Sequence, residues 1–94
     1  MALTLKELRE YINSSFEDAH SSKDNTWLAA LSPIASQLHI IEGAKTLELQ
    51  MTGCQQLSNS ILVIQMLNTN QSIAQKLNDL RVETGQFAFM GRNS

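Results

Sequence analysis

The chain has 94 residues, 43% of them hydrophobic, which is enough for the core of one domain over residues 1–94 and excludes a wholly disordered chain. Its net charge of −2 and its 7 scattered Lys and Arg residues argue against binding to nucleic acid, which requires clustered positive charge. The single cysteine excludes an internal disulfide, and no apolar run approaches the roughly 20 residues of a membrane span.

The N-terminal segment, residues 1–22, predicts one amphipathic helix followed by a polar break. Thr4 and Glu7 form a capping box, in which the side chain of each residue bonds to the backbone amide of the other. Apolar residues then recur every three or four positions, which predicts a helix from about residue 5 to residue 20. The polar residues 21–25 end this helix.

The second predicted helix has two possible starts. In one interpretation Asn25 or Thr26 caps it. In the other, Ser32 caps it and Pro33 occupies the first turn, where its missing N–H costs nothing. Both interpretations place the apolar residues up to position 41 along one side, and both end the helix at Gly43, a residue type that is common at helix C-termini.

The period changes at residue 46, after which apolar and polar residues alternate. Residues 46–51 therefore predict a first strand, and the β-branched run within residues 60–67 predicts a second. The second strand is apolar on both faces, which is typical of a strand covered on both sides or by a partner. Cys54 falls in the polar connection between the two strands.

The C-terminal third predicts a short helix over about residues 73–80 and a third strand over residues 81–90. The apolar face changes within this strand, and Gly85 is interpreted as a β-bulge at that point. The order of elements predicts an α+β fold whose compact unit covers residues 25–94. Two N-terminal helices are followed by strand-strand-helix-strand, which forms a small, permuted ferredoxin-like sheet.

An all-α helical hairpin or bundle is the alternative fold. Apolar residues between positions 47 and 67 also fit one side of a long helix, at spacings of three and four: Leu47, Met51, Cys54, Leu57, Ile61, Ile64 and Leu67. Gly43, Gly53 and the Ser/Asn-rich breaks are typical of turns and favour the α+β interpretation.

No set of residues predicts catalysis, a cofactor or a metal. His20 and His39 have no third ligand at a conventional spacing, and Cys54 has no Lys, Arg or His nearby in the sequence to activate its thiol. Two carboxylate pairs are interpreted as solvated surface charges: Glu17 with Asp18, and Asp79 with Glu83. The protein is therefore expected to be non-enzymatic and free of cofactors.

The composition favours a protein partner. Only 17% of the residues are charged, and a small sheet exposes edges on which another chain can pair. We expect a dimer, with itself or a sister subunit, through apolar side chains of the second and third strands: Ile61, Val63, Phe87 and Phe89. In the all-α alternative, the protein is a small regulatory inhibitor or chaperone that sequesters a partner helix in a groove.

Three segments carry a family resemblance: Tyr11 followed by Phe16, residues 27–31 (WLAAL), and residues 81–87 (RVETGQF). In this order they resemble the periplasmic C-terminal domain of the type II secretion inner-membrane L protein. The resemblance implies an assembly scaffold of a bacterial protein-secretion machine, which pairs with itself or with a sister subunit of like fold in the periplasm. Without the resemblance, the cytoplasm is the expected location.

Overall fold

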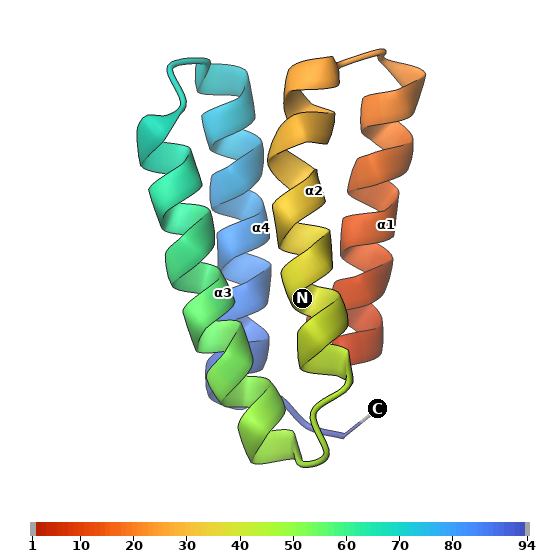
Figure 1. Ribbon diagram of the computed structural model, residues 1–94, viewed down its shortest axis with the longest axis vertical. Helices are drawn as coiled ribbons and strands as arrows, with labels where there is room; N and C mark the ends of the chain where they lie inside the picture. The colour runs from red at the N-terminus through yellow and green to blue at the C-terminus, as the bar shows by residue number, and fades with distance from the viewer. Residues whose placement is uncertain (1, 94) are drawn as a thin grey trace.

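The computed structural model describes residues 2–93 and contains four α-helices joined by short turns (Figure 1). The helices are α1 (Leu5–Ser21), α2 (Asn25–Glu42), α3 (Leu47–Leu67) and α4 (Gln71–Met90). Each helix packs on the next in the chain, and α4 closes the ring by packing on α1. The result is an up-down-up-down antiparallel bundle that measures 36 × 24 × 21 Å.

Side-chain caps define where each helix begins. The Thr4 hydroxyl accepts a hydrogen bond from the Glu7 amide at 3.1 Å, as the sequence predicts. Equivalent caps begin the other three helices, and the four capping residues are Thr4, Asp24, Thr46 and Asn70. Because α2 begins at Asn25, Pro33 lies inside the helix, and the start at Ser32 is wrong.

The predicted α+β fold is wrong, since residues 2–93 contain no strand. Residues 47–51 and 60–67, predicted as parts of two strands, lie within α3, and Thr46 is its N-cap. Residues 81–90, predicted as the third strand, form the C-terminal half of α4. The ferredoxin-like assignment is therefore also wrong, and the all-α alternative describes the chain.

The alternation that predicts strands is produced by a helix with a few exposed apolar residues. Leu47 and Met51 are four residues apart, and both are half-buried on the inner side of α3. Leu49, between them, is exposed. In the apolar run 61–64 the first residue is buried and the last half-buried, whereas the middle two are exposed. Short apolar runs fit both periods, so the pattern alone does not separate a strand from a helix.

Gly53, which argued against a helix, and Cys54, which was expected in a polar connection, both lie within α3. A Cβ atom on Gly53 would lie 2.8 Å from Cγ1 of Ile41, so the absence of a side chain lets α2 and α3 approach closely. Cys54 is fully buried in α3 and does not lie in a polar loop. Gly85 lies within α4 at negative φ and forms no bulge.

The core runs along the bundle axis and takes side chains from all four helices. Its largest fully buried apolar members are Leu8, Ile12, Leu31, Ile34, Leu38, Leu57, Ile61, Ile73, Leu77, Leu80 and Phe87. Thr84 is buried among them, and its hydroxyl donates to the backbone carbonyl of Leu80 at 2.8 Å. This hydrogen bond satisfies the polar group without a partner from another helix.

Candidate functional site

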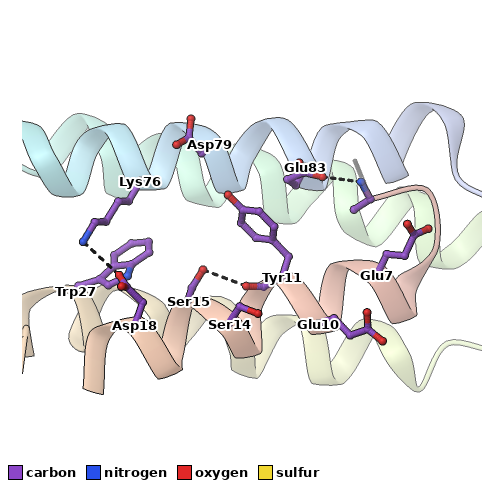
Figure 2. A pocket seen from close by; sticks show the side chains of 11 residues that line it. Glu7, Glu10, Tyr11, Ser14, Ser15, Asp18, Trp27, Lys76, Asp79 and Glu83 are labelled. Atoms are coloured by element: carbon purple, nitrogen blue, oxygen red, sulfur yellow. Dashed lines mark hydrogen bonds and ion pairs between the residues drawn. The ribbon is translucent and has the colours of Figure 1, made fainter. Parts of the chain in front are cut away.

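A groove of about 500 Å³ lies between α1 and α4 (Figure 2). Its wall on α1 is formed by one polar stripe, and three residues of α4 form the opposite wall. Trp27 of α2 and Ala2 contribute at the two ends. The lining consists of Ala2, Glu7, Glu10, Tyr11, Ser14, Ser15, Asp18, Trp27, Lys76, Asp79 and Glu83.

The groove follows from the helix period. On α1 the residues that line it recur three or four positions apart, beside the buried stripe that contains Leu8 and Ile12. The two central lining residues, Ser14 and Ser15, are too short to fill the space toward α4. On α4 the lining residues Lys76, Asp79 and Glu83 also share one side. Charged and short side chains therefore replace apolar packing along this seam.

The groove is strongly acidic. Five of the nine Asp and Glu residues of the chain line it, together with one lysine: Glu7, Glu10, Asp18, Asp79, Glu83 and Lys76. On α1 the carboxylates extend from Glu7 to Asp18, a distance of about 16 Å at ~1.5 Å per residue. The negative charge is thus spread along an elongated channel, and the potential inside it favours cations.

One end of the groove shows how an ammonium group is held there. Nζ of Lys76 lies 3.6 Å from Oδ2 of Asp18 and 5.7 Å from the centroid of the Trp27 ring. Figure 2 shows this lysine reaching from α4 toward both groups. A carboxylate beside an aromatic face is a favourable arrangement for a cation, because both carry negative potential toward it.

Tyr11 occupies the middle of the groove, and its ring extends from α1 toward α4 (Figure 2). Burial raises the pKa of its hydroxyl above the ordinary value, and the nearby charges of Asp79 and Glu83 raise it further. The hydroxyl therefore stays protonated at neutral pH. Tyr11 presents a flat apolar surface together with a hydrogen-bonding group among the carboxylates.

The N-terminal segment closes the other end of the groove. The backbone amide of Ala2 donates to Oε2 of Glu83 at 2.6 Å, and this bond joins the start of the chain to α4. Figure 2 shows this contact near the side chains of Glu7 and Glu10. The carboxylate of Glu83 is thereby held in a fixed position at the edge of the groove.

The described residues offer no metal-binding cluster. Within residues 2–93, no group of three or more His, Cys, Asp or Glu residues is arranged to hold a metal ion. The two histidines also lie apart: His20 is exposed at the end of α1, and His39 is exposed on α2, 4.0 Å from Glu42. In the same range, no helix is long and apolar enough to cross a membrane.

Comparison of the chain with protein-family models, curated proteins and solved structures gives no match. The segment that resembles a strand of the secretion protein, residues 81–87, is helical here.

The four residues predicted to bind a partner do not form one surface. Ile61 and Phe87 are fully buried in the core, whereas Val63 and Phe89 are exposed on α3 and α4. In a strand, residues two apart share a face, but in a helix they point about 200° apart. This difference in period explains why only one residue of each pair reaches the surface.

Sequence reasoning missed the acidic groove. Asp79 and Glu83 are one turn apart on α4 and line the groove with Asp18. Asp18 and Asp79 are exposed, which agrees with their interpretation as solvated charges, but that interpretation did not bring the two helices together. A signal was present in the polar residues spaced three and four apart on the first helix. This spacing predicts a groove only when the last helix is known to pack beside the first.

Proposed function

We propose that the protein is a non-enzymatic helical domain that binds a basic segment of a partner protein in the groove between α1 and α4. The observation that carries this proposal is the concentration of five carboxylates along one elongated groove. A chain with net charge −2 gains no stability from placing like charges on facing helices, since such charges repel each other. A positively charged ligand removes this repulsion.

The shape of the charged array favours a chain segment over a compact ion. Carboxylates spread over about 16 Å of α1 match several separate positive charges along a peptide. Tyr11 in the middle of the groove offers an aromatic surface to the aliphatic stems and guanidinium groups of Lys and Arg, whereas Trp27 at its end is buried, with Lys76 over its ring. The contact between Lys76 and both Asp18 and Trp27 is the same interaction made within the chain.

The test uses the single tryptophan as a reporter. Trp27 lies at the end of the groove next to Lys76, so a basic peptide that displaces this lysine changes the fluorescence of Trp27. We expect saturable binding of an oligo-arginine or oligo-lysine peptide, with an affinity that falls as the salt concentration rises. A peptide of the same length, with every Arg or Lys replaced by Gln, serves as the ligand control.

A matched pair of variants places the binding in the groove. Asp79→Asn removes one groove charge, and Glu48→Gln removes one exposed charge at the start of α3, away from the groove. The change in net charge is the same, so a non-specific electrostatic effect weakens binding equally in both. We expect about a fivefold to tenfold loss for Asp79→Asn and less than about twofold for Glu48→Gln. Equal losses, or no binding by the wild-type protein, would refute the proposed function.

A further inference from the structure

A second surface, at the C-terminal end of α3, exposes several large apolar side chains. Their exposed fractions range from 37% for Leu62 to 79% for Leu67. They project outward because Ile61 and Ile64 take the inward positions of the same turns. We call this surface the α3 patch, and it consists of Leu62, Val63, Met66 and Leu67.

The α3 patch lies in a stretch of sequence without charge. Residues 49–75 contain no Asp, Glu, Lys, Arg or His, so all of α3 beyond its first turn is neutral. Beside the patch, a shallow and mainly apolar hollow of about 320 Å³ separates α3 from the start of α2. Its lining consists of Thr26, Ala29, Ala30, Ile64, Leu67 and Asn68.

The neutrality of the patch limits what can cover it. A charged partner finds no opposite charge here, and an anionic membrane surface needs basic residues at the rim of an apolar patch. A second copy of this chain meets neither difficulty. In a two-fold symmetric contact each patch faces itself, and two neutral apolar patches are complementary without like-charge repulsion.

The exposed area also suits self-association. From their exposed fractions, the four side chains present roughly 500 Å² of surface, which is at the upper end for a monomeric protein. A standard interface buries about 800 Å² on each partner. The hollow beside the patch, with Thr26 and Ala29 in its lining, supplies adjoining uncharged surface toward that area.

We infer that the α3 patch is a homodimer interface, in which α3 of one copy packs against α3 of the other. This inference is independent of the proposed function, because the patch and the acidic groove lie on opposite sides of the bundle. α1 and α4 form the groove, whereas the patch and its hollow lie along α3 and α2. Both grooves stay accessible in the dimer.

Sedimentation of the full chain tests the inference. Over about 10–500 μM we expect a concentration-dependent shift from 10.5 kDa toward twice that mass, as a micromolar dimer requires. Met66→Lys puts two like charges into the contact, and we expect it to weaken the dimer about 100-fold. The matched control is Ile40→Lys, because Ile40 is 75% and Met66 is 76% exposed, but Ile40 lies near the other end of α2. The control is expected to change the dimer by less than about threefold.

Circular dichroism of both variants confirms that they remain folded, as expected for exposed sites. A cysteine at position 63 or 66 reports the geometry directly, since residues near a two-fold axis meet their own copies and form a disulfide on oxidation. Cys54 is buried and can stay in place. Three results would each overturn the inference: a monomer at all concentrations, equal effects of Met66→Lys and Ile40→Lys, or a dimer that shows no cross-link from either position.

Discussion

Replacing Gly85 by alanine separates the helical structure from the strand with a bulge that the sequence favours. A Cβ atom at Gly85 would meet only Oγ of Ser58, at 4.0 Å, among atoms beyond its own helix backbone, which is ordinary contact distance. Its φ is not positive, so alanine fits without strain. Alanine in a helix interior is about 0.8–1 kcal/mol more favourable than glycine. We therefore expect Gly85→Ala to raise the free energy of unfolding by about that amount and the melting temperature by roughly 3–8 °C.

Gly53→Ala is the matched control, because the same substitution in α3 has the same propensity gain. There the new Cβ would lie 2.8 Å from Cγ1 of Ile41, whose side chain is buried. Overpacking of this kind costs about 1–3 kcal/mol, which exceeds the gain and leaves a net loss of about 1 kcal/mol. Urea unfolding followed by far-UV circular dichroism measures both variants. Destabilisation by Gly85→Ala, or an equal gain in both variants, contradicts the helix packing described here.

Four further substitutions test the core, one exposed site and one surface ion pair. Cys54→Ser should lower the free energy of unfolding, measured in urea, by about 1–2 kcal/mol, because it buries a hydroxyl in an apolar site. Burial also raises the pKa of the Cys54 thiol to about 12, so a thiol reagent should label the native protein far more slowly than the unfolded one. Phe87→Ala should lower the free energy of unfolding by about 3–5 kcal/mol in the same assay, because Phe87 is fully buried, and Phe89→Ala should lower it by less than about 0.5 kcal/mol, because Phe89 is exposed. Similar losses for the two variants would indicate that both residues share one face of a strand. The Arg9 guanidinium, 2.6 Å from Glu42, holds the pKa of that carboxyl below its usual value, so its stabilisation is present above pH 4.5 and is lost as the pH falls through the lowered pKa. Glu42→Gln should therefore cost about 0.5–1 kcal/mol at neutral pH and nothing at acid pH, and a pH-independent loss would contradict this account.

The first half of the fold could be predicted from the sequence because its signals agree. The N-cap at Thr4, the helix over residues 5–20 and the end of the second helix at Gly43 are confirmed. Of the capping box only one half forms as predicted, because the Glu7 side chain accepts from the Thr4 hydroxyl at 3.1 Å. At each of these positions a local side-chain preference and the apolar period indicate the same element.

The third helix was predicted wrongly because one tertiary contact and one hydrogen bond within the helix accommodate residues that are typical of breaks. Gly53 weakens a helix in isolation, but here it makes room for Ile41 of the neighbouring helix. Ser60, part of a Ser/Asn-rich break in the sequence, donates its hydroxyl hydrogen to the Gln56 carbonyl within the same helix at 3.1 Å. The low helix propensities of Gly and Ser are real but small, and burial of the inner side of α3 outweighs them.

The distribution of charge connects the two proposed surfaces and gives them opposite responses to salt. The groove holds five carboxylates, whereas residues 49–75, which include the α3 patch, hold no charge. Screening weakens contacts between exposed charges over a Debye length of about 8 Å at physiological ionic strength, but it leaves apolar burial largely unaffected. Added salt should therefore release a basic peptide from the groove while the dimer persists or strengthens. Because one variable moves the two equilibria in different directions, the binding of a basic segment and the association of two copies can be measured separately in one sample.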